Sequence, residues 1–191
     1  LADKSYSSDG KTLTDIPFEE TKTMIQGVYS PERFLEIFRD YIYFQDREYD
    51  SDEKEIVCRY PQFFATNKLY ENVKLHLRPE GDGKGGTYFG ATGCGKSYTM
   101  MFLTRMLMKS KFFRSPTILI ITDRTDLDDQ LSKQFVGSKK YIGDDTVVSI
   151  ESREKLRQEL QGRTSGGVYM TTIQKFTEDL EVLTDRSNVI C

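Results

Sequence analysis

The sequence has little of what metal-binding, secreted and membrane proteins need. Its 191 residues include one histidine, and the three cysteines, Cys58, Cys94 and Cys191, are odd in number and far apart. This pattern indicates reduced thiols in a cytoplasmic protein rather than a disulfide framework. No cysteine or second histidine lies near His76, so a metal-binding role for it is not expected. The chain also has no run of eighteen apolar residues and no apolar stretch near its start, which argues against a membrane span and a signal peptide.

An excess of positive charge is missing as well. The 27 lysines and arginines are outnumbered by 30 acidic residues, which gives a formal net charge of -3. Any contact with nucleic acid must therefore come from local groups rather than from a basic surface. With 37% hydrophobic residues, the chain can bury the core of one domain with a helical extension.

The first part of the chain divides into two expected segments. Residues 1–29 have few periodic signals and are expected to form a linker or surface segment. Residues 30–85 are expected to form a helical lead-in, because SPE at 30–32 and YPQ at 60–62 each place a proline in the first turn of a helix. The first of these helices is expected to carry a core-facing apolar stripe at helical spacing, made of Phe34, Phe38, Tyr41 and Ile42.

From residue 86 to residue 191, β-type runs alternate with helical segments. The runs expected to be strands are 87–89, 117–122, 146–150, 168–171 and 188–191. Helices are expected at about 96–109, 125–135, 152–161 and 173–183. Such alternation predicts an α/β fold with a parallel sheet and helices on both faces.

A phosphate-binding loop separates the first expected strand from the first expected helix. Residues 90–97, GATGCGKS, match the pattern G-x-x-x-x-G-K-[ST]. Glycines let backbone N–H groups turn toward phosphate oxygens, and the helix adds the positive end of its dipole. We expect Lys96 to contact the β- and γ-phosphates of ATP and the Ser97 hydroxyl to bind Mg²⁺. The residues predicted to contact the nucleotide here are Gly90, Thr92, Gly93, Cys94, Gly95, Lys96, Ser97 and Tyr98.

Hydrolysis of ATP also needs a carboxylate at the end of another strand to hold the metal ion. Asp123 follows the apolar run 117–122 and is one candidate, although a solvated turn before a capped helix explains the same acidic cluster. The other possibility is an acid that follows the apolar residues 188–191, and this possibility is favoured.

Four segments together resemble the first motor lobe of the R (HsdR-type) subunit of type I restriction endonucleases, which are DNA translocases of helicase superfamily 2. The segments are GATGCGKSYTM, PTILIITDRTDLDDQL, GGVYMTTIQKF and DRSNVIC, and the resemblance covers about residues 30–191. It implies a P-loop NTPase (RecA-like) lobe at residues 86–191 that ends before an Asp-Glu-Ala-His box with the catalytic acids. It also implies ATP and Mg²⁺ as cofactors, and double-stranded DNA and the methylation and specificity subunits as partners. ATP would power translocation in the full subunit, and the fragment alone is expected to be inactive.

The same resemblance implies roles for residues outside the loop. Gln62 would hydrogen-bond the edge of adenine, with a polar residue in a first helical turn as the alternative. Arg124, Thr171, Thr172 and Gln174 would lie near the DNA backbone, where hydroxyls and helix-start amides can bind phosphates without a basic surface. A turn before a capped helix and a strand that ends in threonines are the structural alternatives for these four residues.

Two other functions are compatible with the phosphate loop. A small-molecule P-loop kinase would use Asp123 as its metal-binding acid and would need several arginines in a lid. Arg153, Arg157 and Arg163 are available for that role, but no lid arrangement is recognisable. A regulatory module would bind nucleotide without hydrolysing it.

Overall fold

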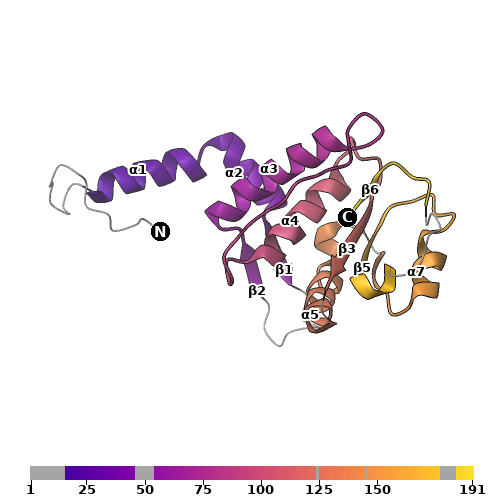
Figure 1. The fold of residues 1–191 in the computed structure, drawn as a ribbon. Helices are drawn as coiled ribbons and strands as arrows, with labels where there is room; N and C mark the ends of the chain where they lie inside the picture. The colour runs from indigo at the N-terminus through magenta and orange to yellow at the C-terminus, as the bar shows by residue number, and fades with distance from the viewer. Residues whose placement is uncertain (1–15, 46–53, 124, 145, 177–183) are drawn as a thin grey trace. The chain divides into compact units, whose positions relative to one another are not determined.

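The structure is a computed structural model whose chain divides into two compact units, Leu1–Asp40 and Tyr41–Cys191. It describes residues 16–45, 54–123, 125–144, 146–176 and 184–191 (Figure 1).

The first unit contains two helices, α1 (Ile16–Val28) and α2 (Pro31–Asp40). Helix α2 begins at the predicted proline, with an acidic residue in its first turn. Helix α1 lies in the segment expected to be a linker or surface segment. Its apolar side chains Met24 and Ile25 are 50% and 52% exposed, so these two residues do not form a buried stripe.

The second unit begins with a β-hairpin that the sequence does not predict. Strand β1 (Ile42–Gln45) pairs antiparallel with β2 (Lys54–Val57). The helical spacing of Tyr41 and Ile42 predicts that they extend the stripe of α2, but that helix ends at Asp40. The predicted core-facing stripe is wrong, because Phe34 and Phe38 of α2 are 44% and 68% exposed. Tyr41 packs in the core of the second unit and Ile42 is half-buried in β1, so their helical spacing does not mark a helix face.

Helix α3 (Tyr60–His76) packs against α4 (Lys96–Lys109) and belongs to the second unit, although the sequence places it in the lead-in (Figure 1). The ring of Tyr41, which is fully buried, lies 4.9 Å from the ring of Phe63 on α3 and 5.3 Å from the ring of Phe102 on α4. These aromatic contacts join the hairpin and both helices in one core.

A four-stranded parallel sheet forms the centre of the second unit, in the order β4-β5-β3-β6. Its strands are β3 (Thr117–Thr122), β4 (Val147–Ser149), β5 (Gly167–Thr172) and β6 (Val189–Ile190). Each lies within one or two residues of a predicted run. The α/β class and the parallel sheet are therefore confirmed.

The predicted strand at 87–89 is wrong, because these residues do not form a strand. A strand requires a neighbour that accepts its backbone hydrogen bonds. Strand β6, at the edge of the sheet, spans only Val189–Ile190, and both residues pair with β3. Phe89 is 93% exposed, so the β-type residues of this run are not buried in the sheet.

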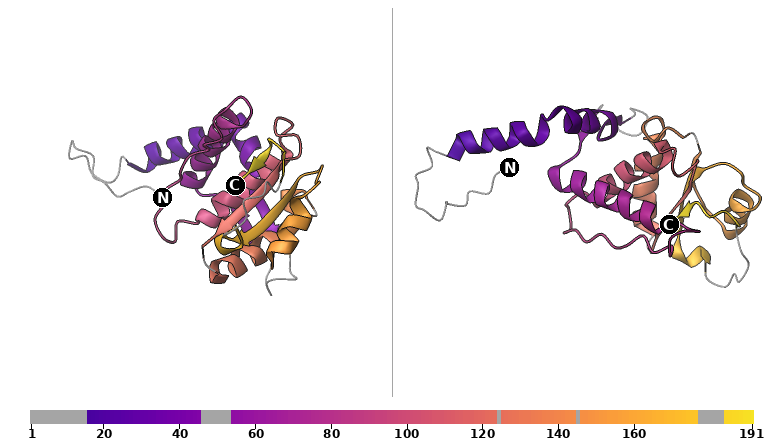
Figure 2. Two further views of the ribbon diagram at one scale, coloured as in Figure 1. Left: turned by 45° about the vertical axis from the view of Figure 1, so that its right-hand side comes forward. Right: turned by 90° about the horizontal axis from the view of Figure 1, so that it is seen from above.

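Helices cover both faces of the sheet, as predicted (Figures 1 and 2). Helices α5 (Thr125–Val136) and α6 (Lys139–Ile142) connect β3 to β4, and α7 (Arg153–Leu160) connects β4 to β5. These two crossovers run in opposite directions across the sheet, and right-handed crossovers then place their helices on opposite faces. After β5, Ile173–Phe176 forms a short 3-10 helix, and residues 177–183 of the predicted helix lie outside the described residues.

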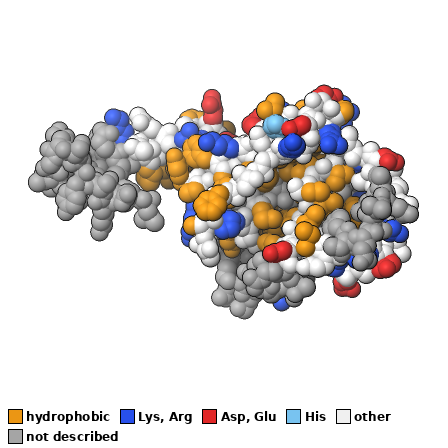
Figure 3. Space-filling model, viewed as in Figure 1, with side chains coloured by type: hydrophobic (Ala, Val, Ile, Leu, Met, Phe, Trp, Pro, Cys, Tyr) orange, Lys and Arg blue, Asp and Glu red, His pale blue; other side chains and the backbone are white. Residues whose placement is uncertain are grey.

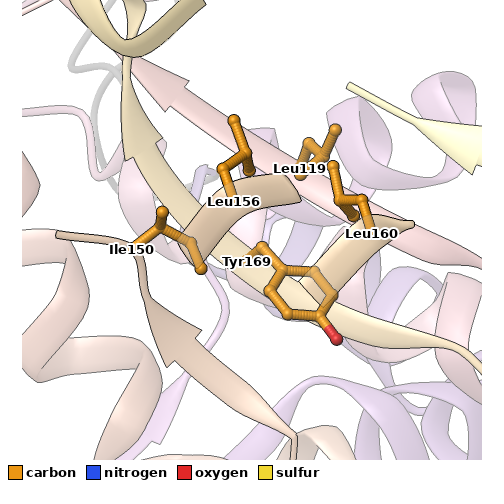
Figure 4. Packing of buried hydrophobic residues seen from close by; sticks show 5 residues of the cluster. All are labelled: Leu119, Ile150, Leu156, Leu160 and Tyr169. Atoms are coloured by element: carbon orange, nitrogen blue, oxygen red, sulfur yellow. The ribbon is translucent and has the colours of Figure 1, made fainter. Parts of the chain in front are cut away.

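A tight apolar cluster holds α7 on its face of the sheet (Figure 4). Leu119 of β3 and Tyr169 of β5 are register partners, so their side chains share one face. Leu156 and Leu160 of α7 pack on them together with Ile150, and all five side chains are at most 6% exposed.

Replacing Leu156 with alanine should lower the free energy of unfolding by about 2 to 5 kcal/mol, because the buried methyl groups are lost and a cavity remains. Leu75→Ala is the matched control, since Leu75 on α3 is 72% exposed and the same change should cost less than about 0.5 kcal/mol. Urea unfolding followed by circular dichroism measures both values. Equal costs would show that α7 does not pack as described.

Candidate functional site

The loop of residues 90–95 leads directly into the first turn of α4, where the motif predicts a helix start. Gly93 and Gly95 have φ angles of +78° and +82°, a backbone conformation that glycine adopts without steric cost. The loop also closes on itself, because the N–H of Cys94 donates to the carbonyl of Ala91 at 3.2 Å. The first N–H groups of α4 have no intrahelical acceptors, so they are available to an anion in this loop.

Lys96 lies across this loop. Its ammonium group donates to the carbonyls of Gly90 and Ala91 at 2.9 and 3.0 Å. Phosphate oxygens would form stronger, charge-assisted hydrogen bonds in place of these two. The structure thus brings the predicted loop residues Gly90, Thr92, Gly93, Cys94, Gly95, Lys96, Ser97 and Tyr98 together in one turn and the start of one helix.

Gln62 lies beside the loop and is only 4% exposed. Its Oε1 accepts a hydrogen bond from the N–H of Arg59 at 2.7 Å. Its Nε2 donates to the carbonyl of Gly95 at 3.0 Å and lies 3.5 Å from the carbonyl of Cys94. The predicted position next to a nucleotide is compatible with this location, and the predicted contact with adenine stays a prediction.

Sequence reasoning missed an exposed aromatic pair next to Gln62. Tyr60 is 78% exposed, and its ring centroid lies 4.7 Å from that of Phe64. The only sequence signal was an aromatic residue in the first turn of the helix that contains Gln62. Figure 3 shows other hydrophobic side chains at the surface, on the side of the molecule seen in Figure 1.

The ends of β3 and β5 bring a second group of predicted residues together. Thr122 and Thr172 are register partners, and the Gln174 amide donates to the carbonyl of Asp123 at 2.9 Å. The Thr171 and Thr172 side chains are 0% and 4% exposed, whereas Gln174 is exposed. In this arrangement the exposed Gln174 is accessible to a binding partner such as DNA, whereas the two threonines are buried. Their contact with DNA stays a prediction, and Arg124 lies outside the described residues.

Two titratable groups near the C-terminal end of α3, Asp82 and His76, have a structural role. Asp82, in the segment between α3 and the phosphate loop, accepts a hydrogen bond from the Lys84 N–H at 2.9 Å and contacts His76 at 2.6 Å. The Lys84 N–H, and then the His76 contact, hold the pKa of Asp82 below its usual value. Within the described ranges, no cluster of three or more histidine, cysteine or acidic side chains could hold a metal ion. The helices of the described part of the chain are too short or too polar to span a bilayer.

Gly95→Ala should destabilise the protein more than Gly93→Ala. Both positions have positive φ, which costs a residue other than glycine about 1 to 2 kcal/mol. An added Cβ at Gly95 would also lie 2.4 Å from Nε2 of the buried Gln62, whereas at Gly93 no atom lies within 4 Å. Urea titration of both variants measures the difference, and a Gly93→Ala cost equal to or above that of Gly95→Ala would contradict the packing of Gln62 on the loop.

The SWI2/SNF2 ATPase family model matches residues 61–191 of the chain. This match starts in the first turn of α3 and includes the loop and the whole parallel sheet.

Among curated proteins, the chain is similar to endonuclease subunits of type I restriction enzymes. It is 34% identical over 179 residues to the HindI subunit of Haemophilus influenzae, which covers 90% of this chain and 17% of the relative. It is 32% identical over 183 residues to the putative MjaIXP subunit of Methanocaldococcus jannaschii, covering 91% of this chain and 16% of that protein. The chain therefore spans about a sixth of the length of these relatives. The resemblance carried by the four sequence segments is confirmed.

Proposed function

The chain belongs to the SWI2/SNF2 ATPase family, whose ATPase domain has a RecA-like P-loop fold, and from this premise we propose that it binds ATP with Mg²⁺ at residues 90–97. We further propose that it is part of the DNA-translocating subunit of a type I restriction enzyme, where ATP hydrolysis drives movement along duplex DNA before cleavage. The names of its relatives support this assignment.

The observation that carries the proposal is the conformation of the loop around Lys96. Gly93 and Gly95 have positive φ angles, and α4 starts directly after the loop. The Lys96 ammonium group donates to the carbonyls of Gly90 and Ala91 in the loop. A triphosphate would take the place of those carbonyls as partner of Lys96, and the Ser97 hydroxyl would be a ligand of Mg²⁺. The metal ion would neutralise charge on the phosphates. The exposed ring of Tyr60 is available to contact the base.

We propose that DNA contacts the protein at the C-terminal ends of β3 and β5. Gln174 is exposed there and is tied to the end of β3 through the carbonyl of Asp123. Although the chain has a net charge of -3, such local amides can contact a phosphate backbone. The methylation and specificity subunits of a restriction complex are the proposed protein partners.

The kinase alternative gains no support from two of its three candidate lid arginines, Arg153 and Arg163. The Arg163 guanidinium lies 5.1 Å from the centre of the Tyr169 ring and donates to the carbonyls of Ser165 and Gly166. Arg153 donates to the carbonyl of Gln174 at 3.4 Å. Both side chains thus stabilise the local fold.

Lys96→Ala should lower the affinity for MgATP at least about tenfold, because a charge-assisted contact with the phosphates is lost. Lys109→Ala is the matched control, since this lysine lies at the other end of the same helix, roughly 20 Å away at 1.5 Å per residue. Isothermal titration calorimetry measures both affinities. Unchanged binding by Lys96→Ala would mean that the loop does not hold the phosphates.

Duplex DNA should raise the rate of ATP hydrolysis by the protein that carries this chain, because a translocase couples hydrolysis to its track. Phosphate release is measured with and without a linear duplex, and Lys96→Ala should abolish both rates. A rate that responds to a small phosphate acceptor and not to DNA would favour a kinase instead.

A further inference from the structure

Two side chains fasten the segment that leads into β6 to the turn before β3. The Asn188 amide donates to the carbonyls of Phe113 and Arg114 at 2.9 and 3.1 Å, and its Nδ2 lies 3.5 Å from the carbonyl of Ser115. The Arg186 guanidinium donates to the same Ser115 carbonyl at 2.7 Å. Three successive carbonyls of one turn thus accept hydrogen bonds from side chains that come much later in the chain. We call Arg186 and Asn188 the β6 clip.

The turn that the β6 clip contacts has an unfavourable backbone conformation. Arg114 and Ser115 have φ angles of +51° and +56°, a region in which the Cβ of an L-residue is crowded. Residues keep such a conformation only where their surroundings hold it. The backbone at Gly166 also packs on this turn, since a Cβ there would lie 2.6 Å from the carbonyl oxygen of Pro116. The β6 clip is therefore one of the contacts that hold the turn in place.

Arg186 also connects β6 to the two central strands. Its guanidinium donates to the Thr117 hydroxyl at 2.8 Å and to the carbonyl of Ser165, just before β5, at 2.6 Å. The Thr117 N–H in turn donates to the carbonyl of Asn188 at 3.1 Å. Thr117 is only 1% exposed, so its hydrogen bonds are shielded from water. The start of β6 is thus fixed to β3 through both backbone and side chains.

Strand β6 needs this support because its own ladder is short. Only Val189 and Ile190 pair with β3, opposite Thr117 and Ile118. A slip by one residue would turn the side chains of β6 to the opposite face, and a slip by two would move the residues that follow by about 6 to 7 Å. Since two pairs specify the register weakly, the side-chain contacts of the β6 clip determine it.

The register of β6 matters at the other end of the strand. Because β6 is parallel to β3, the chain runs toward the edge of the sheet where β3 ends, and ligands of open parallel sheets bind at that edge. Hydrolysis of ATP requires a carboxylate at the end of such a strand to hold the metal ion. A carboxylate that follows residues 188–191 would take its position from the register of β6. A displacement of about 1 Å at a reacting group can slow a reaction roughly a hundredfold.

We propose that Arg186 and Asn188 are positioning residues for ATP hydrolysis, which fix β6 and thereby the metal-binding carboxylate at its end. This inference rests on the proposed function. It assigns the carboxylate to the end of β6 rather than to Asp123 at the end of β3. The contacts of the β6 clip lie at the start of the strands, so the clip should act on the rate of hydrolysis and leave the binding of ATP to the phosphate loop unchanged.

The first test compares hydrolysis with binding in Asn188→Asp and Arg186→Gln. The aspartate has nearly the size of asparagine but places acceptors against the carbonyls of the turn, and the glutamine is too short to reach all the partners of Arg186. In the protein that carries this chain, kcat for ATP should fall at least about tenfold in each variant. The affinity for ATP, measured by calorimetry in the presence of EDTA, should change less than about twofold. A wild-type kcat in both variants would overturn the proposal and favour Asp123.

Hydrogen exchange provides a second test that needs neither nucleotide nor activity. The Thr117 amide reports on β6 because it donates to the carbonyl of Asn188, and the Val168 amide reports on the other side of the sheet because it donates to the carbonyl of Thr146 at 2.8 Å. In both variants the Thr117 amide should exchange faster, and the Val168 amide should exchange as in wild type, as measured by NMR on the full chain. Unchanged exchange at Thr117 would show that the clip does not hold β6, and the proposal would be wrong.

Arg186→Lys is the conservative variant, which serves should the larger changes prevent folding. Lysine keeps the charge but lacks the rigid fork of donors that reaches Ser115 and Ser165 together. Its kcat should therefore lie between those of wild type and Arg186→Gln. A kcat equal to that of wild type, with faster exchange at Thr117, would contradict the proposed link between β6 and hydrolysis.

Arg163→Gln is the matched control at the same end of the sheet. The Arg163 guanidinium also donates to the carbonyl of Ser165, at 3.0 Å, and to that of Gly166, at 2.8 Å. Its loss should lower stability and leave kcat and the exchange at Thr117 unchanged. An equal fall in kcat would show that any damage at this end slows hydrolysis, which would refute a specific role of the clip. A wild-type protein that binds no ATP would instead refute the proposed function, and the catalytic role of the clip with it.

Discussion

The parallel pairing of β3 with β5 is the constraint on which the rest of the second unit depends. The two strands pair over six residues without a slip, from Thr117↔Gly167 to Thr122↔Thr172. A shift by one residue would reverse every side chain and would move Leu119 and Tyr169 away from α7. At the start of these strands, the Arg186 guanidinium donates to the Thr117 hydroxyl of β3 and to the carbonyl of Ser165, just before β5, so it joins the two strand starts from outside the sheet. The ends of the strands then coincide, and Gln174 meets the end of β3.

Helix α3, which lies outside the alternating strands and helices of the sheet, adds a second constraint on the fold of this unit. It is held to the rest of the unit by aromatic packing at Phe63, by the Asn67 contact with Tyr41 and by the amide of Gln62 on the loop. Because the first buried residue of this unit is Tyr41, the core includes the hairpin and α3 as well as the sheet. The loop thus contacts α3 through Gln62 at its C-terminal end, whereas Ala91, Thr92 and Gly93 are exposed.

Much of this arrangement could be predicted from short local patterns. The start of α4 at Lys96, the whole of β3 and the proline that opens α3 follow from a motif, an apolar run and a capping rule. The hairpin β1–β2 could not be predicted, because Tyr41 and Ile42 fit a helical period as well as a strand. The strand predicted at residues 87–89 is wrong for a different reason, since β-type residues form a strand only where a neighbouring strand accepts their hydrogen bonds. Similarly, spacing alone does not reveal that Thr171 and Thr172 are covered while Gln174 is exposed.

The ATPase unit begins earlier in the chain than the sequence predicts. A glycine-rich segment such as residues 78–86 favours a domain boundary when composition alone is considered. Contacts place the boundary earlier, and the family match begins at residue 61, within the first turn of α3. The burial of Gln62 against the phosphate loop shows that α3 is part of the ATPase unit and not only a connection to it. Removing an amide from water costs free energy unless its hydrogen bonds are replaced. Gln62 satisfies that requirement only when α3 and the loop are both in place, so its burial ties the formation of the loop to the docking of the helix.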